Sequence, residues 1–131
     1  MPTLVVSAAV IIRDRKVLLT QRPGGTHLES LWEFPGGKVE EGESPGEALA
    51  RELREEIAVE ARVDDILEVT FWRYPKRDVL LLFYRTTIVS GTIEHLGVAA
   101  HAWVALDELD GYAMPPADVP VLTKVRALLV A

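Results

Sequence analysis

The N-terminal part of the chain is patterned as β-strands, and a helical pattern follows it. Residues 3–13 and 16–22 are rich in apolar and β-branched side chains. The polar pair at 14–15 separates them, which predicts a hairpin. Three shorter elements come next: a loop at 23–30, a short apolar segment at 31–34 and a Pro-Gly-Gly turn at 35–37.

The clearest helix signal lies immediately before the middle of the chain. Ser44 is suited to the N-cap, Pro45 to the first helical position, and Ser44 with Glu47 forms a capping box. An apolar stripe at helical spacing follows, made by Leu49, Ala50, Leu53 and Ile57. The pattern therefore predicts a helix from Pro45 to about Ile57.

The second half of the chain again favours strands and ends in a helix. Five elements are predicted: strands at 61–74 and 78–90 joined by a turn at 75–77, a strand at 99–104, and one helical turn at 106–109. The apolar run 79–84 suits a central strand covered on both faces. Asp118 is a candidate N-cap for a final helix at 119–130, with Pro120 in its first turn. Strands combined with two helices fit an α/β layered fold with a mixed sheet.

Composition narrows the class of protein. A chain of 131 residues with 49 % hydrophobic residues is expected to form one domain, and without cysteine it has no disulfides or thiolate ligands. A net charge of −6 argues against binding to a nucleic acid duplex. The apolar run 4–12 is too short to span a bilayer and has no basic leader, so we expect no membrane partner and a cytoplasmic location.

Three glutamates on the central helix are the best candidates for chemistry. Glu52, Glu55 and Glu56 share one face, where like charges three and four residues apart disfavour the helix. Arg51 is spaced to pair with Glu47 or with Glu55. Converging carboxylates suit a hard divalent cation, so one hypothesis is a magnesium site that handles phosphates. The alternative is a solvated helix face with ordinary surface pairs.

The stretch GGKVEEGESPGEALARELREEIAV, from Gly36 to Val59, resembles the Nudix box, whose pattern is G-x5-E-x7-R-E-U-x-E-E-x-G-U with U a bulky aliphatic residue. The matching positions are Gly37, Glu43, Arg51, Glu52, Leu53, Glu55, Glu56 and Val59. Ala58 departs from the final glycine, which would ease a positive φ at the helix end. The segments TQR (20–22), LWEFPGGK (31–38), YPKRD (74–78) and MPPADVPVLTKV (114–125) are also similar to the MutT-like nucleoside triphosphate pyrophosphohydrolases.

The resemblance implies a single Nudix hydrolase domain over 1–131, folded as an α/β/α sandwich with a mixed β-sheet. It implies Mg²⁺, or Mn²⁺, held by Glu52, Glu55, Glu56 and the carbonyl of Gly36, with Glu52 as a candidate general base. Glu43 would support the loop and Arg51 would orient the glutamates. Substrate contacts are implied for Arg22 and Lys38 at the phosphates, and for Phe34, Tyr74, Arg77 and Asp118 at the base. The implied reaction is attack of water on a phosphorus of the diphosphate bridge, which releases a nucleoside monophosphate and pyrophosphate.

Two positions depart from MutT. A further metal-binding glutamate is replaced by Ala102, for which Glu94 or its loop is a substitute to consider, and an asparagine that reads the base is replaced by Asp118. An ionised Asp only accepts hydrogen bonds, so the preferred base edge should differ. The alternative interpretations are that Asp118 is only a helix cap, Phe34 and Tyr74 are only packing residues, and Arg22 is a surface residue.

Two rival functions stay open at this point. One is hydrolysis of a nucleotide sugar or a dinucleotide. The other is a nucleotide-binding sensor with little turnover. The sequence fits a monomer or a homodimer.

Overall fold

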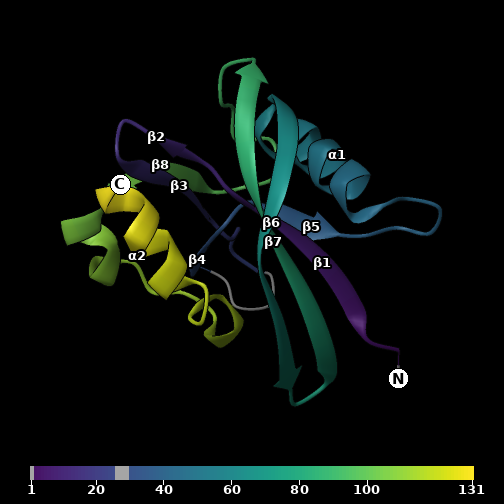
Figure 1. Cartoon of the computed structure of the whole chain (residues 1–131). Coiled ribbons are helices and arrows are strands. Elements are labelled where there is room, and N and C mark those ends of the chain that lie inside the picture. Colours follow the sequence, from purple (N-terminus) through teal and green to yellow (C-terminus); the bar gives the residue numbers. More distant parts are fainter. Residues whose placement is uncertain (1, 26–29) are drawn as a thin grey trace.

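The computed structural model describes residues 2–25 and 30–131, so residues 26–29 of the predicted loop lie outside the described residues. Its elements, in chain order, are β1 (Leu4–Val10), β2 (Ile12–Arg13), β3 (Lys16–Gln21), β4 (Trp32–Glu33), β5 (Gly36–Lys38), α1 (Pro45–Ile57), β6 (Glu60–Tyr74), β7 (Arg77–Ser90), β8 (Ala100–Ala105), the 3₁₀ helices η1 (Leu106–Gly111) and η2 (Pro116–Asp118), and α2 (Leu122–Val130). Figure 1 shows them along the chain. No helix of the described residues is long and apolar enough to cross a membrane.

The strands form two sheets. One has the order β5-β1-β7-β6, in which β1 runs parallel to β7 while β5 and β6 are antiparallel to their neighbours. The mixed sheet expected from the sequence is therefore confirmed. In the other sheet β3 pairs antiparallel with β2, β4 and β8. The sequence does not predict this second sheet, because strand partners are set by contacts between distant segments.

The first predicted strand, 3–13, is divided between the two sheets. Residues 4–10 pair with β7, and after Ile11 residues 12–13 pair with β3 instead. The predicted hairpin is present in this second part, where Ile12 pairs with Val17. Its turn residues Asp14 and Arg15 have φ of 52° and 61°, as the tight turns that match strand twist require.

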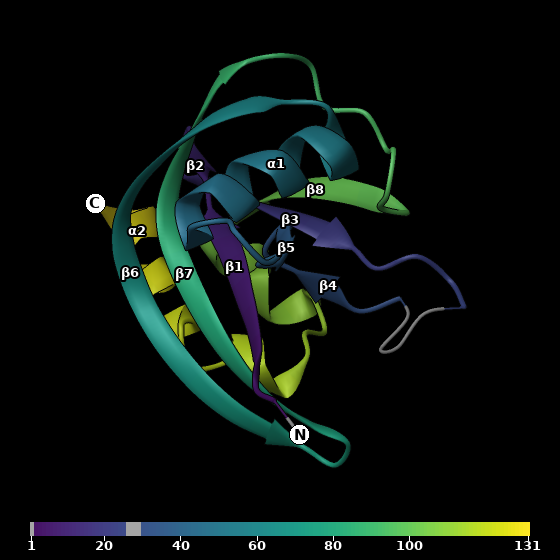
Figure 2. The same ribbon diagram turned by 90° about the vertical axis from the view of Figure 1, so that its right-hand side faces the viewer.

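Two hydrophobic cores lie on opposite faces of the strands, each closed by one helix. Along β3 the side chains alternate, so that Val17 and Leu19 join the core containing Val125 of α2, whereas Leu18 joins the core containing Leu53 of α1. Figures 1 and 2 show α1 and α2 on opposite sides of the strands. This arrangement is the expected α/β/α sandwich.

Helix α1 forms over the predicted residues and for the predicted reasons. The Ser44 hydroxyl accepts a hydrogen bond from the Glu47 N–H (3.2 Å), and the Glu47 carboxylate accepts one from the Ser44 N–H (2.8 Å). Leu49, Leu53 and Ile57 are completely buried. The helix ends at Ala58, which has φ 63° and ψ 31°, the left-handed conformation that a glycine would adopt with less strain.

The β6–β7 hairpin confirms two further predicted strands, although its turn is shorter than predicted. Tyr74 pairs with Arg77, which leaves Pro75 and Lys76 as the turn and makes Arg77 a strand residue. β7 is an interior strand, but its two faces differ. Phe83 on the α2 side is completely buried, whereas Leu80 and Leu82 on the other side are only half-buried.

The C-terminal helix begins later than predicted. Helix α2 starts at Leu122 after an N-cap at Val121, and Pro120 precedes it. Asp118 ends η2 and does not cap α2, so the N-cap interpretation of Asp118 is wrong. Its N–H donates to the Pro115 carbonyl (3.0 Å), because Pro115 and Pro116 favour a separate turn at this point. The Asp118 side chain is therefore available for a role other than helix capping.

Candidate active site

The two glycines before α1 form a strand and not the predicted turn. Gly36 and Gly37 belong to β5, where they pair with Ala8 and Ser7. A Cβ on Gly36 would collide with the Ser7 carbonyl, and a Cβ on Gly37 with the Glu52 carboxylate. Glycine is therefore needed here for close approach of the strand to its neighbour and to a carboxylate, more than for a turn.

Arg51 connects the acidic residues of this region. Its Nε donates to Glu43 Oε2 (2.6 Å) and its Nη2 to Glu43 Oε1 (3.0 Å). Its Nη1 donates to Glu52 (3.0 Å) and to Glu55 (2.9 Å), and Nη2 also donates to the Lys38 carbonyl (3.1 Å). Of the two pairings that the sequence allows, only that with Glu55 forms, because Glu47 is bonded within the capping box.

Glu52 and Glu56 face a common cavity, whereas Glu55 does not. The cavity has a volume of about 340 Å³, and Gly36, Gly37 and Thr20 also line it. Burial raises the pKa of the Glu52 carboxyl, which Arg51 partly offsets. Burial also raises the pKa of Glu56, and the nearby Glu52 and Glu33 raise it further. Both carboxylates are crowded in a way that a bound cation would relieve.

The fit of this site to a metal ion is partial. Glu52, Glu56 and Gly36 provide oxygen atoms around one cavity, which is the donor type that hard divalent cations prefer. Glu55 has a side chain 54 % exposed and paired with Arg51. Within residues 2–25 and 30–131, no three acidic or histidine side chains are grouped closely enough to hold a metal. The Glu55 side chain would have to rotate away from Arg51 to complete the predicted set of metal ligands.

The segment before β8 packs against the end of α1. The N–H groups of Leu96 and Gly97 both donate to the Glu56 carbonyl, at 3.0 and 3.1 Å. A Cβ on Gly97 would collide with the Glu56 carboxylate, so this segment limits where that carboxylate can lie. Ala102 packs into the core on the α2 side, and Glu94 is an exposed residue whose N–H donates to the Ile57 carbonyl.

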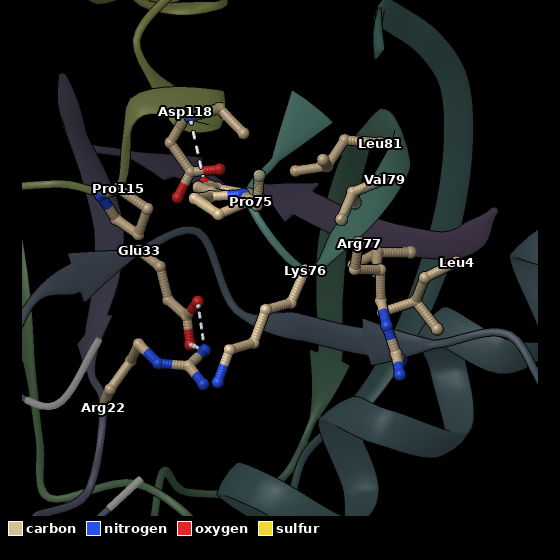
Figure 3. A pocket seen from close by; sticks show the side chains of 13 residues that line it. Leu4, Arg22, Glu33, Pro75, Lys76, Arg77, Val79, Leu81, Pro115 and Asp118 are labelled. Carbon is tan, nitrogen blue, oxygen red and sulfur yellow. Dashed lines mark hydrogen bonds and ion pairs between the residues drawn. The ribbon is translucent and has the colours of Figure 1, made fainter. Parts of the chain in front are cut away.

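Figure 3 shows a second, larger cavity of about 680 Å³. It adjoins the first, because Arg22 and Glu33 line both. Its walls are mostly apolar, with a few polar and charged side chains among them. It is lined by Leu4, Val6, Arg22, Glu33, Tyr74, Pro75, Lys76, Arg77, Val79, Leu81, Pro115, Ala117 and Asp118. An apolar cleft with a few convergent polar groups is typical of a small-molecule site. Below, "glutamate cavity" means the smaller cavity beside Glu52 and Glu56, and "apolar cavity" means this larger one.

Four of the predicted substrate residues line the apolar cavity, and two do not. Arg22, Tyr74, Arg77 and Asp118 are on its wall. The Tyr74 hydroxyl accepts a hydrogen bond from the Ala117 N–H (3.3 Å), which ties η2 to the hairpin. Phe34 and Lys38 are not among the described residues that line either cavity. Phe34 is 3 % exposed and packs edge-on against Phe83, with ring centroids 5.8 Å apart.

Asp118 is a buried carboxyl group on the wall of the apolar cavity. The residue is 5 % exposed, and burial raises its pKa well above the usual range. Nearby Glu33 raises the pKa further and Arg22 lowers it. In Figure 3 the carboxyl is directed toward Glu33. A neutral Asp can donate as well as accept, which an ionised one cannot.

Glu33 is the residue at this site that sequence reasoning missed. It accepts two hydrogen bonds from Nη1 of Arg22, at 3.0 and 3.2 Å. Burial raises the pKa of its carboxyl, and Arg22 opposes that rise. The neighbouring Trp32 and Phe34 both pack into the α2-side core. A charged residue between two core aromatics was the available signal, since alternation turns it to the other face.

Comparisons with known proteins agree with this fold. The NUDIX domain family model matches residues 3–127. The chain is 39 % identical over 131 residues to the CTP pyrophosphohydrolase of Escherichia coli K12, covering 100 % of this chain and 97 % of that protein. It is 32 % identical over 123 residues to the 8-oxo-dGTP diphosphatase of the same organism, covering 92 % and 95 %. The crystal structure of the MutT NUDIX hydrolase from Burkholderia pseudomallei superposes with a TM-score of 0.86 at 27 % identity, covering 95 % of this chain and 99 % of that one.

The chain belongs to the Nudix family, and it is a hydrolase of that family. The MutT-like resemblance is thereby confirmed. Nudix hydrolases generally use divalent metal ions.

Proposed function

We propose that this protein hydrolyses a nucleoside triphosphate, normal or chemically modified, to a nucleoside monophosphate and pyrophosphate. The observation that carries the proposal is the contact between two unlike cavities. The glutamate cavity is suited to a metal-bound polyphosphate, and the apolar cavity is suited to a base. Relatives named for the hydrolysis of CTP and 8-oxo-dGTP support the same substrate class.

The residues divide into three tasks. Glu52 and Glu56, with Glu55 once it leaves Arg51, would hold Mg²⁺, or Mn²⁺, beside the Gly36 carbonyl. The metal would supply charge neutralisation for the phosphates and activation of water. Arg51 binds Glu43 of the acidic loop as well as Glu52 and Glu55, and would thereby keep the loop and the glutamates in position. Arg22 would meet phosphate oxygens, and Lys38 would do so only after its side chain moves toward the glutamate cavity.

In the reaction, a water oxygen forms a bond to a phosphorus of the diphosphate bridge. The bond from that phosphorus to the oxygen that bridges the α- and β-phosphates breaks, which separates the nucleoside monophosphate from pyrophosphate. The water proton passes to a carboxylate, for which Glu52 is the candidate because it lines the glutamate cavity.

The base would occupy the apolar cavity between the β6–β7 hairpin and η2. Tyr74 and Arg77 come from the hairpin and Asp118 from η2. Leu81 and Val79 form an apolar wall against which a ring can pack. Phe34 would not contact the base but would support the cavity by packing, since it is buried against Phe83.

The test is release of pyrophosphate from a panel of triphosphates, including CTP, dCTP, dGTP and 8-oxo-dGTP, with Mg²⁺ or Mn²⁺. We expect the two products in equal amounts, and a difference of at least tenfold in kcat/KM between the best and the worst base. Hydrolysis of a nucleotide sugar or dinucleotide in place of every triphosphate would support the first rival. Tight binding of a triphosphate with no product would support the sensor.

A further inference from the structure

The apolar cavity and the glutamate cavity meet at one ion pair. Of the described residues, only Arg22 and Glu33 line both. Nη1 of Arg22 lies 3.0 Å from Oε1 of Glu33, and the two side chains are 28 % and 27 % exposed. A ligand that extends from one cavity into the other must therefore lie against this pair (Figure 3).

The backbone fixes where the two side chains start. Glu33 of β4 pairs with Thr20 of β3, and the Arg22 N–H, two residues further along the chain, donates to the Leu31 carbonyl (2.9 Å). The Trp32 ring packs edge-on against Tyr112, with centroids 5.0 Å apart, and this holds β4 in place. The backbone of Arg22 and Glu33 is therefore held by strand pairing and by the hydrogen bond that follows it, and a change of partner would involve their side chains alone.

The pair lies beside charged groups in both cavities. Asp118 lines the apolar cavity with Arg22 and Glu33, and its pKa is raised by burial, raised further by Glu33 and lowered by Arg22. Glu52 and Glu56 line the glutamate cavity with the same pair. A change in how Arg22 and Glu33 are paired therefore alters the lining of both cavities.

An anion in the glutamate cavity competes with Glu33 for the Arg22 guanidinium. If Arg22 turns to the anion, Glu33 is left as a half-buried carboxylate without its partner, and such a group needs a new hydrogen-bond donor. The adjacent wall of the apolar cavity offers the aliphatic side chains of Val79 and Leu81 and the carboxyl of Asp118. An N–H group on the edge of a bound base is a donor that would fit between them.

We propose that Glu33 couples the two cavities. A phosphate ligand in the glutamate cavity draws Arg22 away, and the released Glu33 carboxylate then accepts a hydrogen bond from an N–H of the base in the apolar cavity. This inference rests on the proposed function, since it takes the two cavities as the phosphate and base sites. It makes Glu33 a positioning residue for Arg22 and a specificity residue for bases that carry an amino or imino donor.

The experiment measures binding of each half of the substrate in the presence of the other. Cytidine and 8-oxo-2′-deoxyguanosine serve separately as base probes, and inorganic pyrophosphate with Mg²⁺ serves as the phosphate probe. Their dissociation constants are obtained by NMR titration of the isotope-labelled full chain. Saturating pyrophosphate should tighten nucleoside binding about fivefold or more, and the nucleoside should tighten pyrophosphate binding by the same factor.

Two variants should abolish this coupling. In Glu33→Gln and in Arg22→Gln the factor should fall to about one. Lys76→Gln is the matched control, because Lys76 lines the apolar cavity alone and should retain the wild-type factor. Each variant's amide spectrum shows whether it is folded before the titration is interpreted.

The coupling factor decides the inference independently of turnover. A wild-type factor in Glu33→Gln, or no coupling in the wild type when both probes bind, would overturn it. Loss of coupling in the Lys76→Gln control would overturn it as well, since the effect would then not belong to the ion pair. Coupling that is present in a protein unable to hydrolyse any triphosphate would contradict the proposed function and leave the role of Glu33 in place. A wild type that binds neither probe contradicts both.

Discussion

Arg51 donates two hydrogen bonds to the Glu43 carboxylate, from Nε to Oε2 (2.6 Å) and from Nη2 to Oε1 (3.0 Å). The Oε1 atom of Glu43 also accepts a hydrogen bond from the Glu40 N–H (2.9 Å), so the Glu43 carboxylate connects the acidic loop to the helix. The remaining nitrogen, Nη1, reaches Glu52 and Glu55. The loop and the glutamates are thus positioned by the same planar group.

Arg51→Lys should lower kcat/KM about 10²-fold, because an ammonium cannot reproduce this fork and the glutamates would shift. Glu43→Gln should have a smaller effect in the same direction, since its amide still meets part of the fork. Steady-state kinetics of both single variants and the double variant test this. Losses that simply multiply in the double variant would show that the two residues act independently.

Glu56→Gln should reduce kcat by about 10² or more without lowering Tm. The Glu56 carboxyl is half-buried, and burial together with the nearby acids raises its pKa. Its ionised form is therefore unfavourable to the fold, whereas a neutral glutamine is not. Glu55→Gln should also lose turnover, although it also loses its pair with Arg51. Thermal melts and kinetics at pH 7 make the comparison, with the exposed loop variant Glu41→Gln as control. A collapse of Tm in Glu56→Gln would indicate a structural role instead.

The features that sequence reasoning predicted best depend on nearby residues. Ser44, Glu47 and the apolar stripe from Leu49 to Ile57 act within one helix, so its start, end and buried face could be read directly. The strained exit at Ala58 followed in the same way from a missing glycine. The like-charged face of the helix is also where Glu52 and Glu56 line the glutamate cavity.

The features that were missed depend on partners far along the chain. Whether residues 12–13 stay in the first sheet is decided by β3, and whether Gly36 turns or pairs is decided by the approach of Ser7. Asp118 looked like a cap because the prolines around it suit a helix start, yet they form a separate turn against Tyr74. Glu33 acquires its role only when Arg22, from another strand, is brought beside it.

Ala58→Gly should stabilise the protein by about 0.5–1 kcal/mol and raise Tm by about 2–4 °C. Ala58 adopts φ 63°, and a left-handed conformation costs a residue with a Cβ about 1–2 kcal/mol, part of which the flexibility of glycine in the unfolded chain offsets. The reverse control is Gly42→Ala, at φ 84° with open space around the added methyl group. It should lower Tm by a similar amount. An unchanged Tm in both variants would mean that the chain relaxes these turns without cost.

Asp118→Asn should change which base is preferred more than it changes the maximal rate. The carboxyl lies on the wall of the apolar cavity and does not line the glutamate cavity, and an amide offers its donor NH₂ and its acceptor oxygen in fixed places. The ratio of kcat/KM for CTP and 8-oxo-dGTP, measured in the wild type and the variant, is the relevant quantity. A ratio that stays the same, with both rates reduced, would place Asp118 outside base recognition.

Asp118→Asn should also make the protein more stable than the wild type as the pH rises. Burial holds the pKa of Asp118 well above its value in the unfolded chain, so between the two pKa values the folded state binds more protons than the unfolded state. The free energy of unfolding of the wild type must then fall as pH increases through this window, by about 1.4 kcal/mol for each unit of the rise in pKa. Asparagine does not titrate, so the variant lacks this contribution. Urea denaturation at pH 4 should show nearly equal stabilities, and the same measurement at pH 7 should favour the variant. A difference independent of pH would mean that Asp118 is ionised in the folded protein, with its charge compensated by Arg22.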